Sequence, residues 1–136
     1  MGQWIVGFLG SSLVFLGCDA VWLNFAAGRI YRPRLGALLR DDFALVPAAL
    51  FYVIYIAGIL LFAVAPALES GRWTTALVRG AALGFLAYAT YDLTNQATVR
   101  GWSTTVTVID LAWGTLLTGM SALAAFAAMR WFALSR

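Results

Sequence analysis

Four long apolar stretches constrain this chain more than any other feature. A helix needs roughly 20 apolar residues to cross the hydrocarbon core of a bilayer, and each stretch reaches that length. With 62% hydrophobic and only 11% charged residues, the chain lies well below the roughly one-quarter charged residues of soluble domains. The sequence therefore predicts an all-α integral membrane protein whose residues 1–136 form one domain. The expected transmembrane helices cover about residues 4–27, 43–67, 73–98 and 104–131.

The connections between these stretches predict how the helices are arranged. "ESGR" at 69–72 and "VRGWS" at 99–103 are short enough to be tight turns. Successive helices should therefore be antiparallel neighbours in an up-down four-helix bundle. The longer connection, 28–42, carries four arginines, Pro33 and three spaced leucines. It predicts an interfacial loop with a short amphipathic helix, and Asp42 is the expected N-cap of the second span.

The distribution of basic residues indicates which face of the membrane is cytoplasmic. We call the membrane face that holds the 28–42 connection side A; the 99–103 turn lies on the same face, and the 69–72 turn lies on the opposite face, side B. Five arginines fall on side A and four on side B, so the positive-inside rule favours side A as cytoplasmic. All nine basic residues are arginines, and a net charge of +3 gives no reason to expect a nucleic-acid partner. The single cysteine, Cys18, allows no intrachain disulfide.

Three aspartates interrupt the apolar stretches at one depth. Asp19 lies about eight residues before the side-A end of the first span, and Asp92 lies about six before that of the third. Asp110 lies about six residues after the start of the fourth span. At 1.5 Å per residue, all three carboxylates are expected roughly 9–12 Å inside side A. They are the expected catalytic or proton-binding residues.

Aromatic and polar residues accompany these acids in helical register. Tyr88, Asp92 and Asn95 share one face of the third span, and Trp22 and Trp113 each follow an aspartate by three residues. The side chains expected to bind a substrate are Trp22, Tyr52, Tyr55, Tyr88, Tyr91, Asn95, Thr107 and Trp113. The side-B half of the spans has few polar side chains. The sequence therefore predicts a polar chamber that opens toward side A and is sealed on side B.

Four segments together resemble a known family. The residues that carry the resemblance are "CDAVWL", "FYVIYIAG", "YATYDLTNQATVRGW" and "DLAWG", one from each span. In sequence and spacing they are similar to the bacterial membrane family catalogued as domain of unknown function 2177. The resemblance covers nearly the whole chain and implies a four-span protein of the bacterial inner (cytoplasmic) membrane. It implies no particular activity, so function has to be argued from the acids.

The free-energy cost of placing aspartates inside the membrane favours a functional role for them over a packing role. A carboxylate at the centre of a membrane helix costs about 3 kcal/mol, whereas a hydrogen bond between membrane helices contributes only about 0.6 kcal/mol. Acids held close together in a low dielectric can share a proton. This predicts an intramembrane site for a small or amphiphilic substrate, with proton-linked transport. The alternative is an intramembrane enzyme that uses aspartate acid–base chemistry on a lipid-like substrate. A structural protein, in which each aspartate is hydrogen-bonded for helix packing, is the third interpretation.

Expectations for cofactors and partners follow from the same residues. With no histidine and one cysteine, a zinc-type catalytic site is excluded. No cofactor is expected, although a hard cation such as Mg²⁺ is compatible with the aspartates and Asn95. The expected partners are membrane lipid and the ligand, and a homodimer is a possible working unit for a four-span transporter. Taken alone, Tyr52 and Tyr55 fit ordinary interfacial tyrosines.

Overall fold

The chain is helical over nearly its whole length. The computed structural model describes residues 1–40, 42 and 44–135, and no strand occurs within them. In chain order the α-helices are α1 (Gly2–Ala26), α2 (Arg32–Leu35), α3 (Leu45–Ile59), α4 (Ala65–Ser70), α5 (Trp73–Thr98) and α6 (Thr104–Leu134). π-helical turns at Ala27–Tyr31 and Leu60–Val64 join α1 to α2 and α3 to α4, and a 3₁₀ turn covers Gly36–Leu38. The predicted all-α class is confirmed.

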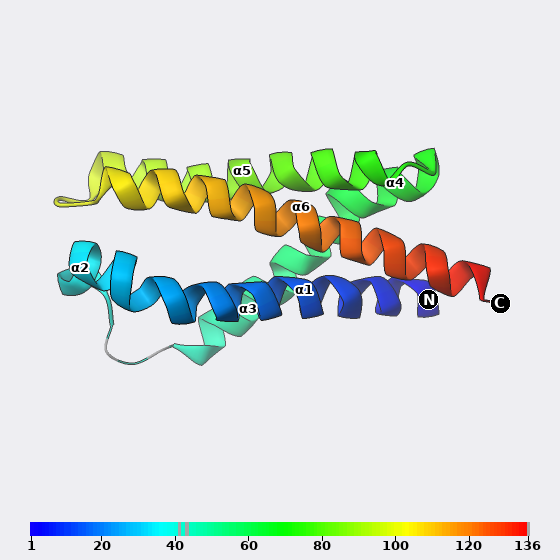
Figure 1. Cartoon of the computed structure of the whole chain (residues 1–136), viewed down its shortest axis with the longest axis horizontal. Helices are drawn as coiled ribbons and strands as arrows, with labels where there is room; N and C mark the ends of the chain where they lie inside the picture. The colour runs from blue at the N-terminus through cyan, green and yellow to red at the C-terminus, as the bar shows by residue number, and fades with distance from the viewer. Residues whose placement is uncertain (41, 43, 136) are drawn as a thin grey trace.

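These elements form four antiparallel rods, namely α1 with α2, α3 with α4, α5, and α6. The start of α1, the end of α6 and the α4–α5 turn lie at one end, which is side B (Figure 1). α2 and the α5–α6 turn lie at the other end, side A. Helix α6 packs along both α5 and α1. The predicted up-down bundle is therefore confirmed.

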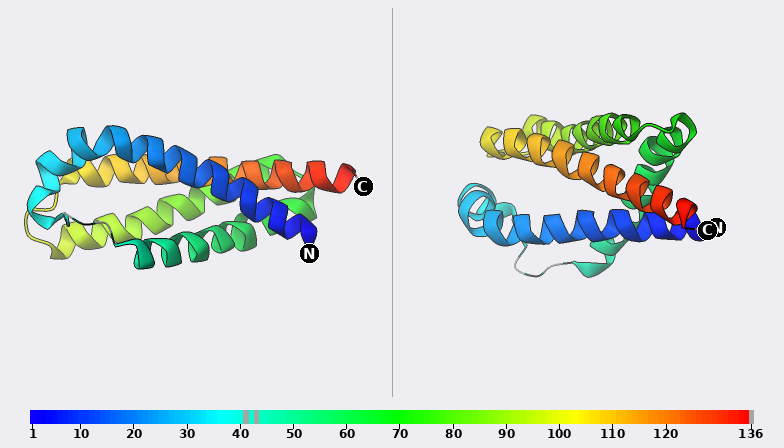
Figure 2. Two further views of the ribbon diagram at one scale, coloured as in Figure 1. Left: turned by 90° about the horizontal axis from the view of Figure 1, so that it is seen from below. Right: turned by 45° about the vertical axis from the view of Figure 1, so that its right-hand side comes forward.

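The second rod is tilted against the other three. α3 has few contacts with α1 and α6, whereas the π-helical turn Leu60–Val64 packs against α5 and α6. Figure 1 and the right-hand view of Figure 2 show the start of α3 standing apart from α5. The rod therefore joins the bundle mainly through its side-B half, and its side-A half is loosely packed.

Three of the rods have the length and composition of membrane spans. Among the described residues, these helical stretches are Gly2–Leu38, Leu45–Ser70 and Thr104–Leu134. Helix α5 is 26 residues long, about 39 Å at the α-helical rise, but it carries Arg79 and Asp92 and is the least apolar of the four long helices. It packs extensively against α6, so the four rods form one helical membrane bundle.

The 28–42 connection differs from its predicted form. The chain stays helical from α1 through the π-helical turn to Leu38, because Pro33 falls in the first turn of α2, where its missing N–H is not needed. Leu35 is buried, but Leu38 and Leu39 are exposed. The three leucines therefore differ in burial, and the interfacial amphipathic helix stays a prediction.

Both ends of the second rod also differ from the prediction. Its expected first residue, Phe43, lies outside the described residues. Ala44 occupies the N-cap position of α3, so the assignment of Asp42 as N-cap is wrong. The rod continues past the expected end at residue 67, because Pro66 lies in the first turn of α4, where a proline is tolerated. The turn is made instead by Gly71, whose φ of +68° is a left-handed conformation suited to glycine.

Glycines set the close approach of α5 to α6. A Cβ atom on Gly84 would lie 2.2 Å from the Gly114 carbonyl oxygen, and a Cβ atom on Gly114 would lie 2.2 Å from the Tyr88 ring. Small residues at these two positions let the helices approach this closely. Because the helices are antiparallel, one further turn along each from the Tyr88–Gly114 contact brings Asp92 of α5 level with Asp110 of α6.

A buried apolar core fills the side-B half of the bundle. It includes Phe15, Ile59, Leu117 and Met129, which are fully buried. Alanines from α5, α6 and the second rod fill the space between these larger side chains. The core thus occupies the part of the spans that has few polar residues in the sequence, and it closes the bundle toward side B.

Candidate functional site

Asp92 is buried beside a second acid. Its side chain is 0% exposed, and neither carboxylate oxygen is hydrogen-bonded to a donor in the part of the chain that the structure describes. It interacts instead with the carboxyl group of Asp110 across the α5–α6 interface. Two ionised carboxylates can only accept hydrogen bonds, so a direct bond between them requires a proton.

Asp110 accepts a hydrogen bond from a tyrosine of the side-A connection. The Tyr31 hydroxyl donates to Asp110 Oδ1 at 2.5 Å, and Trp22 Nε1–H donates to the Tyr31 oxygen at 3.0 Å. The π-helical turn that contains Tyr31 turns the chain from α1 toward α6 (Figure 1). Sequence reasoning missed Tyr31 because the first span was expected to end at Ala27, and a change of direction of this kind leaves no clear signal in the sequence.

Asp19 has partners on both of its oxygens. The Tyr52 hydroxyl donates to Oδ2 at 2.8 Å, and Trp113 Nε1–H donates to Oδ1 at 3.4 Å. The three side chains come from α1, α3 and α6, so this acid ties the loosely packed half of α3 to the bundle. Asp19 thus has the hydrogen bonds that Asp92 lacks.

A stacked tryptophan pair connects the two groups of acids. The rings of Trp22 and Trp113 lie 4.6 Å apart between centroids, with 15° between their planes. Trp113 donates to Asp19, and Trp22 reaches Asp110 through the tyrosine hydroxyl. Residues from all four rods therefore meet in one polar layer, as the depth count predicted.

Two of the other predicted tyrosines lie at the border of this layer. Tyr88 is half-buried, and its hydroxyl is within electrostatic range of Asp19 and Asp110. Tyr55 forms a hydrogen bond of 2.9 Å with Thr118 and has its ring against the apolar core. Tyr88 therefore belongs with the acids, whereas Tyr55 marks where the polar layer meets the core.

The remaining predicted residues lie nearer the side-A end of α5 and α6. Tyr91 is 60% exposed, and its ring meets the edge of Trp102 at 5.7 Å. Asn95 is half-buried beside Tyr91. Thr107 is buried and accepts a hydrogen bond of 3.1 Å from Trp102 Nε1–H. Thr107 thus secures the α5–α6 turn, and no described contact joins it to the aspartates.

A lateral hollow reaches Asp110, one of the paired acids. Its volume is about 330 Å³, and its lining residues are Phe51, Ala87, Tyr88, Tyr91 and Asp110. It lies between the loosely packed half of α3 and α5, with α6 behind. This hollow makes Asp110 approachable from the side of the bundle, and the predicted opening toward side A stays a prediction.

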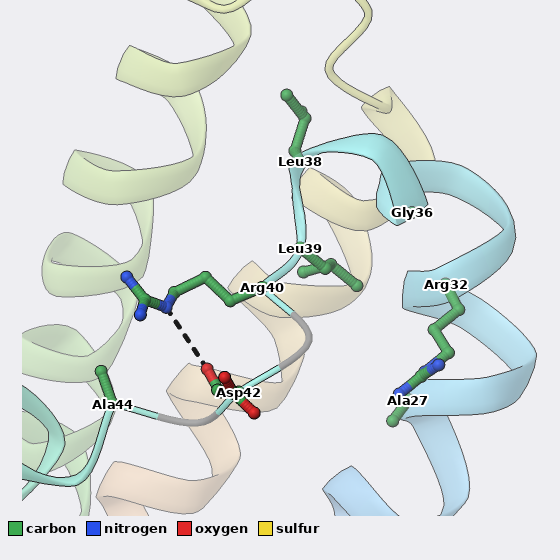
Figure 3. A pocket seen from close by; sticks show the side chains of 8 residues that line it. All are labelled: Ala27, Arg32, Gly36, Leu38, Leu39, Arg40, Asp42 and Ala44. Carbon is green, nitrogen blue, oxygen red and sulfur yellow. Dashed lines mark hydrogen bonds between the residues drawn. The ribbon is translucent and has the colours of Figure 1, made fainter.

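Two further hollows lie away from the paired acids. One, of about 470 Å³, lies on the outer face of α1 and is lined in part by Trp22 and Trp113. The other, of about 640 Å³, lies in the side-A connection and includes Arg32 and Arg40. Figure 3 shows these two arginines on separate parts of the connection, with Arg40 Nε donating to the Asp42 carbonyl oxygen at 3.3 Å. Neither hollow has an intramembrane aspartate in its lining.

The acids form a pair and a separate third member. In the ranges that the structure describes, no three His, Cys, Asp or Glu side chains are grouped so that they could hold a metal ion. The hard-cation alternative at the aspartates stays a prediction. The chemistry that the pair can perform with its own atoms is to hold a proton and to release it to, or accept it from, a bound group.

A known protein family matches most of the chain. The model of a family described as predicted membrane protein, domain of unknown function 2177, matches residues 4–127. The match includes all three aspartates and every predicted lining residue. No curated protein and no solved structure matches the chain.

Proposed function

Because the chain belongs to this family of predicted membrane proteins, we propose that it binds a small or amphiphilic substrate within the bilayer and exchanges it for a proton held by Asp92 and Asp110. The observation that carries the proposal is the environment of Asp92. This side chain is fully buried, interacts with a second acid, and receives no hydrogen bond from any other side chain or backbone group among the described residues.

The energetics of this arrangement argue against a packing role. An acid retained to fix helix packing should have hydrogen-bond donors around it, as Asp19 has. Leaving a buried polar group unpaired costs about 1–3 kcal/mol, and more for a charged group. A proton between Asp92 and Asp110 removes part of this penalty, and a ligand that brings a donor or a positive charge removes it in the same way. Competition between proton and ligand for one place is the basis of proton-linked binding.

The lateral hollow supports an amphiphilic substrate. Phe51 and Tyr91, which line its outer part, are exposed on the surface of the bundle, and Asp110 lies at its inner end. A ligand entering from the bilayer would place its apolar part against the aromatic rings and its polar group against the acids. Small-molecule sites are commonly lined in this way, by apolar walls with a few polar groups.

The proposal includes a membrane location, an orientation and an oligomeric state. We place it in the bacterial inner membrane, with side A and its five arginines toward the cytoplasm. A pair of chains is proposed as the working unit for transport, because an apolar core fills the side-B half of the four-helix bundle and leaves no continuous polar path among the described residues.

Carbodiimide labelling tests the proton at this site. Dicyclohexylcarbodiimide modifies protonated carboxyl groups in apolar surroundings, and the labelled residue is identified by peptide mass spectrometry. We expect label on Asp92 or Asp110 in the wild-type protein in lipid nanodiscs, and no label on the exposed Glu69. The Asp92→Asn variant should lose most of the labelling, whereas the matched variant Glu69→Gln should keep it. Wild-type protein in which neither Asp92 nor Asp110 reacts would contradict a proton-holding pair.

An intramembrane enzyme is the second candidate, because a pair of facing acids is also the composition of a general acid and a general base. Incubation of the protein with inner-membrane lipid and analysis of the lipid by mass spectrometry separates the two. A lipid product that forms with wild-type protein and is absent with Asp110→Asn favours the enzyme. An unchanged lipid profile favours binding and transport.

A further inference from the structure

The negative charge of the site indicates the sign of the charge that a ligand should carry. The ionisable groups that act on Asp92 and Asp110 are each other, Asp19 and Tyr31, and no described arginine is among them. A single shared proton therefore leaves negative charge in the layer when the acids are otherwise ionised. An anionic ligand would meet repulsion that a low dielectric strengthens, whereas a cation would be attracted.

The walls of the hollow have the chemistry that receives organic cations. Three aromatic side chains, Phe51, Tyr88 and Tyr91, line the approach to Asp110. The faces of aromatic rings attract cations, and rings grouped around a cavity are used to bind ammonium groups that carry no hydrogen-bond donor. The exposed position of Tyr91 places one such ring where a ligand would leave the bilayer.

We propose that the substrate of this site is a lipophilic organic cation, which enters between α3 and α5 and places its positive charge against the Asp92–Asp110 pair. The inference rests on the proposed function and adds the sign of the ligand's charge to it. The cation replaces the shared proton: its arrival frees that proton, and its departure lets a proton return, so charge at the pair is conserved without any covalent step. Asp19 keeps its own donors throughout and sets the field around the pair.

A matched pair of probes tests the sign of the charge directly. Tetraphenylphosphonium and tetraphenylborate have nearly the same size and shape and opposite charge. Their binding is measured by equilibrium dialysis against the wild-type protein in nanodiscs of zwitterionic lipid, with empty nanodiscs subtracted. We expect the cation to bind at least tenfold more tightly than the anion. Equal binding, or a preference for the anion, would overturn the proposal without the need for any variant.

Variants then locate the preference at the pair. Asp92→Asn and Asp110→Asn should each weaken binding of tetraphenylphosphonium at least tenfold. Glu69→Gln removes the same charge from the exposed side-B end of the chain and should leave binding within twofold. If all three variants weaken binding equally, the cation responds to overall charge and the proposed site is wrong.

The aromatic wall is tested by a change at an exposed residue. Tyr91→Leu removes the ring, and Tyr91→Phe keeps it. We expect a loss of about two- to fivefold in binding of the cation for the leucine variant and little change for the phenylalanine variant. Equal effects of the two variants would show that the Tyr91 ring does not contribute to binding of the cation.

Carbodiimide labelling separates failure of this inference from failure of the proposed function. Protection of Asp92 by tetraphenylphosphonium, and not by tetraphenylborate, supports both. Protection by the anion alone would show a substrate site of the opposite charge preference, so the cation proposal would fail while the proposed function stands. Absence of labelling in the unprotected protein would defeat the proton-holding pair itself.

Discussion

The effect of removing charge from Asp92 distinguishes a functional acid from a packing acid. Asn keeps the shape of Asp, and its amide group supplies donors that the carboxylate lacks. In the wild-type protein no group of the described residues other than Asp110 bonds to Asp92, so the substitution replaces only the proposed shared-proton bond. The new amide can instead donate to Asp110, and a hydrogen bond to a charged group contributes about 1.5–3 kcal/mol. We therefore expect Asp92→Asn to be as stable as the wild-type protein or up to about 3 kcal/mol more stable.

Asp19→Asn is the matched comparison, because it makes the same chemical change where both oxygens are already used. Its bonds from Tyr52 and Trp113 become neutral, and charge-assisted bonds are roughly twice as strong as neutral ones. With about 1 kcal/mol for each neutral bond, the two changes together should cost about 1–2 kcal/mol.

Thermal unfolding in detergent, followed by tryptophan fluorescence, measures this difference. For a chain of this size, 1 kcal/mol corresponds to about 3–5 °C in the melting temperature. We expect Asp92→Asn to melt at or above the wild-type temperature and Asp19→Asn to melt several degrees below it. If Asp92→Asn loses as much stability as Asp19→Asn, the buried acid contributes to packing, and the functional interpretation of its missing partners is refuted.

Two further substitutions test the framework around the pair. Gly114→Ala would put a Cβ atom 2.2 Å from the Tyr88 ring, and this overpacking should lower stability by about 1–3 kcal/mol. The control is Gly17→Ala, whose added Cβ meets nothing within 4 Å and which should be neutral. Equal effects of the two substitutions on the melting temperature would refute the predicted clash. Tyr31→Phe removes the hydroxyl that donates to Asp110 and should lower stability by about 1.5–3 kcal/mol; an unchanged melting temperature would show that this contact does not hold the side-A connection over the site.

The helices and the depth of the acids were predictable from the sequence for a simple reason. The length of an apolar run sets the length of a membrane helix, and the rise per residue sets the height of each side chain in it. Asp19, Asp92 and Asp110 were placed in one layer by this count alone, and their connected contacts agree with it. The short turns predicted the order of the helices for a similarly local reason.

The pairing of the acids could not be predicted in the same way. A depth count gives height along the bundle axis and says nothing about which helices touch. Here Asp110 is the neighbour of Asp92 because Tyr88 packs against Gly114 one turn away on each helix, and this register is a property of two helices together. The role of Tyr31 depends on a π-helical turn, and the lateral hollow depends on the tilt of α3. All three are tertiary features without a local pattern in the sequence.

Infrared spectroscopy can detect the proton that we propose Asp92 and Asp110 hold between them inside the membrane. The measurement is the difference spectrum between wild-type protein and Asp92→Asn in lipid, recorded in water and in deuterated water. We expect a carbonyl stretching band of a protonated carboxylic acid that is present in the wild-type protein, shifts on deuteration and is absent from the variant. A difference spectrum that contains only bands of ionised carboxylate would contradict the shared proton.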